Sequence, residues 1–174
     1  MRRGLKRATQ VVGSLARARI FRARDLKHRG VSPTWMGFFE FWAGARHHGL
    51  GVWSTPDYRP TRYERVQIRF PRAVFCGASA LWLLGELATE PEELWIAIDN
   101  KARPPRTIDS PTVIIRTRRL EEDVVLHQPA GCELTLRVRA ALRARAEMST
   151  RTRTIRKAAP AFIRWDPTKR PPLP

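Results

Sequence analysis

The stretch PRAVFCGASALWLLGELATEPEELWIAI, residues 71–98, decides how the second half of the chain folds. Its last five residues, LWIAI, form a continuous apolar run, which is typical of a strand covered on both faces. Its first part predicts a helix that ends near Gly85, with one broad apolar face made by Val74, Phe75, Ala78, Leu81 and Trp82. A helix followed by a buried strand is therefore expected here.

Further strands are expected beyond a polar, proline-rich loop at residues 99–111. They are TVII at 112–115, VVL at 124–126 and ELTLRVR at 133–139. The last of these alternates apolar and polar residues, so its apolar side chains share one face of a strand. Residues 64–140 are therefore predicted to form a small α/β domain with a mixed sheet.

The first 58 residues predict three short helices and a β-hairpin. The expected helices cover residues 5–18, 22–29 and 33–43. Leu26 points inward in the second helix, and Ser32 with Pro33 starts the third. Glycines at 49 and 51 permit a tight hairpin. This order predicts a winged helix-turn-helix over residues 1–58, and the fold class of the whole chain is α+β.

Two segments outside these domains lack a clear apolar period. Residues 55–64, TPDYRPTRYE, contain two prolines and are predicted to be a linker. Residues 141–174 begin with weak helical propensity and continue into arginine, threonine and proline. They are predicted to be a frayed helix followed by a loose basic tail.

The formal net charge is +17, and it is distributed unevenly. Residues 1–30 contain ten Lys and Arg against one acidic residue, whereas residues 76–100 contain five acidic residues and no Lys or Arg. This asymmetry favours a polyanionic partner, with nucleic acid as the first candidate. A coding bias toward arginine would also raise the charge, so charge alone does not identify the partner.

Neither a secretory signal nor an apolar run long enough to span a membrane is present in the sequence, which predicts a cytoplasmic protein without membrane contact. Cys76 and Cys132 stand far apart and outside any zinc-binding spacing. Two reduced thiols are expected.

The order of these segments resembles the AbiEi family of type IV antitoxins, which are bacterial transcriptional regulators. The resemblance covers about residues 8 to 130 and rests on FRARDLKHRGVSPTW, the glycine-bounded GLGVW, PRAVFCGASAL and LWIAIDNKARPPR. It implies a winged helix-turn-helix before an antitoxin domain, DNA binding at the protein's own promoter, and abortive infection as the setting. It also implies a toxin-antitoxin system whose nucleotidyltransferase-like toxin is neutralised without obligatory contact.

The resemblance assigns a characteristic second-domain segment to Arg72, Ser79, Leu81, Lys101, Pro104 and Arg106. After about Cys132 the sequence departs from the family's pattern, which implies a truncated or degenerate C-terminus.

The expected third helix also departs from the family, because it carries aromatic residues where a DNA-reading helix carries basic and polar ones. It is expected either to be buried or to form an aromatic interface. DNA affinity would then come from phosphate contacts with little sequence specificity. The candidate DNA-binding residues are Arg2, Arg3, Lys6, Arg7, Arg17, Arg19, Arg22, Arg24, Lys27, Arg29, Thr34, Arg46, His47 and His48.

Other classes of function remain as alternatives. A protein-interaction module could use the aromatic third helix, and a homodimer is compatible with the same patch. Asp99-Asn100-Lys101 resembles the end of a metal-dependent nuclease strand, but a plain polar turn explains it better. Ser79, Cys76 and the pair His47-His48 give no recognisable catalytic or metal-binding constellation. We therefore expect no enzymatic activity, no cofactor and no metal.

Overall fold

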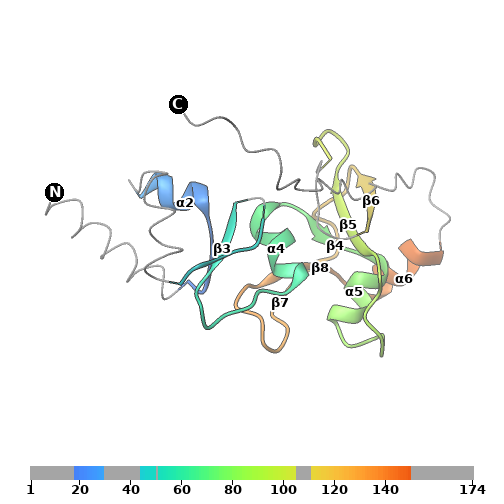
Figure 1. Cartoon of the computed structure of the whole chain (residues 1–174). Helices are drawn as coiled ribbons and strands as arrows, with labels where there is room; N and C mark the ends of the chain where they lie inside the picture. The colour runs from blue at the N-terminus through green and yellow to red at the C-terminus, as the bar shows by residue number, and fades with distance from the viewer. Residues whose placement is uncertain (1–17, 30–43, 50, 105–110, 150–174) are drawn as a thin grey trace, which may run out of the picture.

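A computed structural model describes residues 18–29, 44–49, 51–104 and 111–149. These residues form a mixed α+β fold with four helices and two sheets. Figure 1 shows the smaller sheet with α2 at one end of the molecule and the larger sheet with α5 and α6 at the other.

The smaller sheet is antiparallel and has the strand order β1-β3-β2. Its strands are β1 (Ile20–Arg22), β2 (Arg46–His47) and β3 (Val52–Ser54), and helix α2 (Ala23–His28) follows β1 directly. Gly49 and Gly51 have φ angles of 78° and 75°, so they make the tight hairpin turn between β2 and β3 that the sequence predicts.

The larger sheet is mixed and has the strand order β6-β5-β4-β8-β7. Its strands are β4 (Val74–Phe75), β5 (Leu94–Asp99), β6 (Thr112–Thr117), β7 (Val124–His127) and β8 (Leu136–Arg139). β5 runs parallel to β6, and β4 runs parallel to β8. The predicted mixed sheet is therefore confirmed, with all of its expected strands.

Helix α4 (Arg62–Arg69) lies between the two sheets and contacts β1, β3 and β8. On its inner side, Tyr63 and Val66 join the main apolar core with Phe75 and Val138 of the larger sheet. Just before α4, Tyr58 packs with Ile20 and Val52 of the smaller sheet. Buried contacts therefore connect the two sheets through this helix.

The prediction of a linker over residues 55–64 misses the start of α4. A signal is present in the sequence: the Thr61 side chain accepts a hydrogen bond from the Glu64 backbone amide at 3.2 Å, and Glu64 Oε2 accepts one from the Thr61 amide at 3.0 Å. This reciprocal pair is a capping box, which is readable as Thr-x-x-Glu. The neighbouring prolines obscure it.

The start of the predicted helix at 71–87 is also corrected. Val74 and Phe75 form strand β4, and α5 (Gly77–Leu83) begins only after Cys76. Val74 packs on one side of the sheet with Ala97, whereas Phe75 packs in the core on the other side. Alternation of this kind belongs to a strand, but two adjacent apolar residues cannot reveal it in the sequence.

Beyond β8, which is shorter than the predicted strand at 133–139, α6 (Ala141–Ser149) packs against α5. The Arg139 guanidinium, 1% exposed, forms an ion pair with Glu147 Oε1 at 3.3 Å. Glu147 Oε2 also accepts a hydrogen bond from the Gly77 backbone amide at 3.3 Å. The predicted tail therefore begins with a helix that is anchored to the domain rather than frayed.

The predicted helix at 5–18, except for its last residue, the predicted helix at 33–43 and the sequence after residue 149 lie outside the described residues. Within the part of the chain that the structure describes, no helix has the length and apolar character needed to cross a membrane.

Candidate nucleic-acid interface

Helix α2 presents several of the predicted DNA-binding side chains on its outer side. Leu26 is fully buried and fixes the inner side of the helix. Arg24, Lys27 and Arg29 are exposed. The buried apolar residue and the exposed cationic residues lie on different sides of α2. The helix therefore presents a basic surface while its apolar side packs in the core.

Arg19 and Arg22 do not belong to this basic surface. The Arg19 guanidinium lies 3.0 Å from Glu133 Oε1 and 3.8 Å from Asp57 Oδ2. The Arg22 guanidinium donates two hydrogen bonds of 3.0 Å to the carboxylate of Asp25 in the first turn of α2. Both guanidinium groups are therefore paired with carboxylates of the chain itself, and their part in DNA binding stays a prediction.

The hairpin adds a second basic surface. Arg46 and His47 are exposed on β2, and the His47 ring lies against the Trp53 ring with centroids 4.6 Å apart. His48 is half-buried, and its Nε2 lies 2.7 Å from Ser54 Oγ. The two histidines therefore have different partners, as expected for neighbours on a strand.

Burial lowers the pKa of His48, and the nearby charges of Arg65, His47 and Arg46 lower it further. A neutral imidazole at neutral pH follows from this environment. The hairpin's fixed positive charge comes from arginine.

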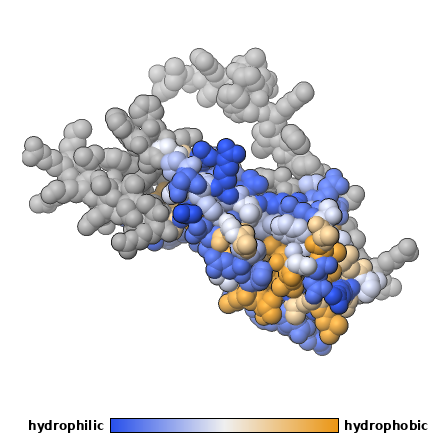
Figure 2. Space-filling view, turned by 90° about the horizontal axis from the view of Figure 1, so that it is seen from below, coloured by the Kyte–Doolittle hydropathy of each residue, from blue (hydrophilic) through white to orange (hydrophobic). Residues whose placement is uncertain are grey.

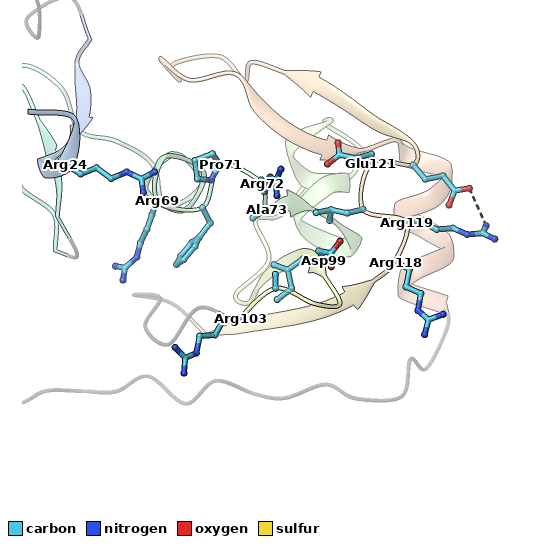
Figure 3. Close-up of a pocket in the computed structure, with 15 residues that line it drawn as sticks. Arg24, Arg69, Pro71, Arg72, Ala73, Asp99, Arg103, Arg118, Arg119 and Glu121 are labelled. Atoms are coloured by element: carbon cyan, nitrogen blue, oxygen red, sulfur yellow. Dashed lines mark ion pairs between the residues drawn. The ribbon is translucent and has the colours of Figure 1, made fainter. Parts of the chain in front are cut away.

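A groove of about 750 Å³ lies between α2, α4 and the larger sheet, and arginines dominate its polar lining (Figure 3). They come from α2, from the end of α4 and the turn after it, and from the loops after β5 and β6; they are Arg24, Arg69, Arg72, Arg103, Arg118 and Arg119. Phe70, Pro71 and Leu120 give the groove apolar walls. Guanidinium groups beside apolar walls suit a phosphate-bearing polymer.

The acidic residues in the groove are engaged by the protein itself. Glu121 pairs with Arg137, whose hydrogen bond lowers the pKa of the Glu121 carboxyl. Glu122 pairs with Arg119 at 3.5 Å, and Asp99 Oδ1 accepts a 2.7 Å hydrogen bond from the Lys101 amide. No carboxylate among the described residues forms an ion pair with Arg103 or Arg118.

Sequence reasoning misses most of this groove. Arg103, Arg118 and Arg119 follow β5 and β6, which are parallel neighbours. The carboxyl ends of parallel strands meet at one edge of a sheet, so basic residues just after two such strands could have predicted the convergence. Arg69 gives no comparable signal, because the helix that carries it is not predicted.

The second-domain residues assigned by resemblance divide into two groups. Ser79 and Leu81 are buried, and Ser79 Oγ accepts a 2.9 Å hydrogen bond from the Trp95 amide, so both hold α5 on the sheet. Arg72 and Lys101 are exposed, and Arg72 lines the groove. Pro104 is half-buried.

Several candidate residues lie outside the described ranges. They are Arg2, Arg3, Lys6, Arg7, Arg17, Thr34 and Arg106.

The candidate catalytic residues are scattered or buried. Asp99 and Glu93 lie at opposite ends of β5, roughly 20 Å apart along an extended strand. In the described ranges, no group of three or more His, Cys, Asp or Glu side chains is arranged to hold a metal ion. Ser79 lies in the first turn of α5 and is fully buried.

No family model matches the chain, and no curated protein matches its sequence.

Proposed function

We propose that this protein is a non-enzymatic, cytoplasmic DNA-binding regulator that represses its own operon and counters a nucleotidyltransferase-like toxin, as the AbiEi resemblance implies. Its first domain would be a winged helix-turn-helix. The strand before α2 and the later hairpin belong to one antiparallel sheet, and this connectivity supports that assignment.

The observation that carries the proposal is the exposed positive charge of α2 and the hairpin. Arg24 and Lys27 on α2 and Arg46 on β2 are exposed. The arginine-lined groove extends the positive charge from Arg24 toward the larger sheet. Lys and Arg side chains in such an arrangement neutralise DNA phosphates and release counterions.

The expected binding is sensitive to salt and weak in sequence discrimination. Phosphate contacts set the position of a protein on DNA but do not distinguish base pairs. The exposed basic residues of α2 and the hairpin, Arg24, Lys27, Arg46 and His47, do not identify a base-reading position.

The test is a fluorescence anisotropy titration of the full chain with its own upstream DNA over a series of salt concentrations. Replacing both Arg24 and Lys27 with Gln should weaken binding and lower the slope of log K against log salt by roughly 0.9 for each DNA phosphate that is no longer neutralised. The matched control is Arg143→Gln with Arg145→Gln, which removes the same charge from exposed positions on α6 at the other end of the molecule.

The control should bind as the unmodified protein does. If the unmodified chain fails to bind DNA at low salt, or if the slope falls equally in both double variants, the charge of α2 has no special role and the proposal is wrong.

A protein-interaction role is the second candidate. Leu142 and Met148 on α6 are 81% and 45% exposed. Figure 2 shows hydrophobic residues gathered on one face toward the end of the molecule that carries α5 and α6. Exposed apolar side chains of this kind favour association with a protein. Loss of toxin neutralisation in Leu142→Gln, with DNA binding intact, would support this role.

A further inference from the structure

A second, smaller pocket lies beside the hairpin and is lined almost entirely by cationic or protonatable side chains. Its volume is about 610 Å³, and its lining consists of Ala45, Arg46, His47, His48, Arg59, Pro60 and Arg65. These residues come from β2 and its flanks, from the segment before α4, and from α4 itself. Three guanidinium groups and two imidazoles therefore face one space.

Among the residues that the structure describes, none of those that line this pocket carries a carboxylate. The carboxylates closest along the chain are used elsewhere: Glu64 is fully buried and accepts hydrogen bonds from Tyr58 and Thr61, and Asp57 pairs with Arg19. Like charges brought together repel one another unless an anion is bound between them. The composition of the pocket suits a multivalent oxyanion.

The hydrogen bonds of His48 determine what its ring can offer to such an anion. Ser54 Oγ donates its hydrogen to a backbone carbonyl, that of Tyr58 at 2.8 Å or that of Thr55 at 3.2 Å. A hydroxyl has one hydrogen, so when Ser54 donates to one of these carbonyls, the 2.7 Å contact is a hydrogen bond donated by His48 Nε2 to Ser54 Oγ. In the neutral ring Nδ1 is then an acceptor, and it becomes a donor only when the ring is protonated.

We propose that this pocket binds a phosphate group, with Arg46 and Arg59 supplying charge and His48 taking up a proton when phosphate binds. The inference rests on the proposed function in one respect: a DNA backbone phosphate is one source of the ligand. A free phosphate or a phosphorylated small molecule has the same chemistry.

Proton uptake follows from the groups that face His48. Burial holds its pKa down, and so do the positive charges of Arg65, His47 and Arg46, while Arg59 adds a further cation to the same pocket. A bound phosphate opposes that charge and raises the pKa of the imidazole. Because coupling is reciprocal, protonation of His48 strengthens phosphate binding by the same factor.

The test is NMR of the full chain with labelled histidine, in which the His48 titration is followed in chloride, in inorganic phosphate at matched ionic strength, and with a short DNA duplex. We expect phosphate or the duplex to raise the pKa of His48. The affinity for the duplex, whose phosphodiesters keep the same charge over this range, should rise about tenfold as the pH falls from about 8 to about 5.5.

Three variants separate the contributions. Arg59→Gln, at an exposed position, should abolish the response of His48. His48→Gln keeps a donor for Ser54 but cannot titrate, so binding should persist without its pH dependence. Arg24→Gln with Lys27→Gln lies outside the pocket and should leave the response to inorganic phosphate intact.

The comparison of chloride, phosphate and duplex also distinguishes DNA phosphate from free phosphate as the ligand. It separates this proposal from the proposed DNA-binding function as well. A response to the duplex at concentrations where free phosphate has no effect identifies the DNA backbone as the ligand. A response to phosphate in a chain that does not bind DNA would uphold the pocket and refute the DNA-binding function. If DNA binds but the pKa of His48 is the same in all solutions, the pocket does not bind phosphate.

Discussion

The Tyr58 hydroxyl lies 2.7 Å from Glu64 Oε1 and donates a hydrogen bond to it, within a buried network that joins the two sheets. The same carboxylate oxygen accepts hydrogen bonds from the backbone amides of Glu133 at 2.7 Å and Leu134 at 3.2 Å. The segment before α4 is therefore bound to the segment before β8 through one carboxylate. Segments distant in the sequence become one rigid support for the hairpin.

Removal of the Glu64 carboxylate should lower the free energy of unfolding more than removal of the Tyr58 hydroxyl does. Glu64→Ala leaves the part-buried amides of Thr61 and Leu134 without an acceptor, at about 1–3 kcal/mol each in the absence of relaxation, and leaves the Glu133 amide only the Tyr58 hydroxyl. Tyr58→Phe removes one donor and should lower the free energy of unfolding by about 1–2 kcal/mol. Urea unfolding followed by circular dichroism measures both, and equal destabilisation of the two variants would contradict this ranking.

Gly77 should not tolerate a side chain. Its φ angle is +47°, and a Cβ atom would lie 2.5 Å from Cε3 of Trp95. Gly77→Ala therefore combines backbone strain with a steric clash against a packed ring, and it should cost about 3 kcal/mol or more.

Gly131 provides the matched control for this substitution. It also has a positive φ, +79°, but a Cβ there would meet nothing within 4 Å. Gly131→Ala should cost only the backbone strain, about 1–2 kcal/mol. Thermal unfolding of both variants tests the difference, and similar destabilisation would show that the Trp95 ring moves aside.

The elements that sequence reasoning finds are those whose pattern is local. LWIAI forms β5 because a continuous apolar run suits a central strand, and Gly49 with Gly51 forms a hairpin turn because both positions need positive φ. Each feature can be recognised without knowing its neighbours in space.

The elements that sequence reasoning misses depend on tertiary contacts. α4 buries the polar residues Glu64 and Gln67, which interrupts the apolar period by which a helix is recognised. Their polar atoms are satisfied by backbone groups about 70 residues away in the sequence, such as the Arg137 amide that donates to Gln67 Oε1 at 2.8 Å. The arginine groove could not be predicted as a whole for the same reason, since α2, α4 and two strand ends build it.

The two cysteines should differ in reactivity. Cys76 is fully buried, and burial together with the charge of Glu147 raises the pKa of its thiol, against a smaller opposing effect of Arg139. Cys132 is half-buried, and burial also raises the pKa of its thiol. Since the thiolate is the reactive form, both should react slowly at neutral pH, and Cys76 should react only on unfolding.

A thiol-specific colorimetric reagent gives the measurement. The native chain should release colour for Cys132 alone, and the chain in denaturant should release it for both cysteines. Cys132→Ser should remove the native reaction completely. Rapid modification of Cys76 in the native Cys132→Ser variant would show that the domain around β4 opens readily.

The groove arginines that lie outside α2 should also contribute to DNA binding. Arg103 and Arg118 are exposed at the ends of two parallel strands and form no ion pair with a described carboxylate, so their replacement should leave the fold unchanged. Arg103→Gln with Arg118→Gln should lower the slope of log K against log salt by up to roughly 1.8 if both side chains neutralise a phosphate.

Arg24 lines the same groove, so the effect should add to that of Arg24→Gln with Lys27→Gln only where the two sets of side chains neutralise different phosphates. Arg137→Gln is unsuitable as a control, because that side chain is only 19% exposed and binds the carbonyl of Arg72, a groove residue. Arg143 and Arg145 also form ion pairs, with Glu147 and Glu86, but they are more exposed and lie outside the groove. The α6 double variant serves again, and anisotropy titrations measure all of them. An unchanged slope in the Arg103 and Arg118 variant, with binding still dependent on α2, would confine DNA contact to the N-terminal sheet and its helices.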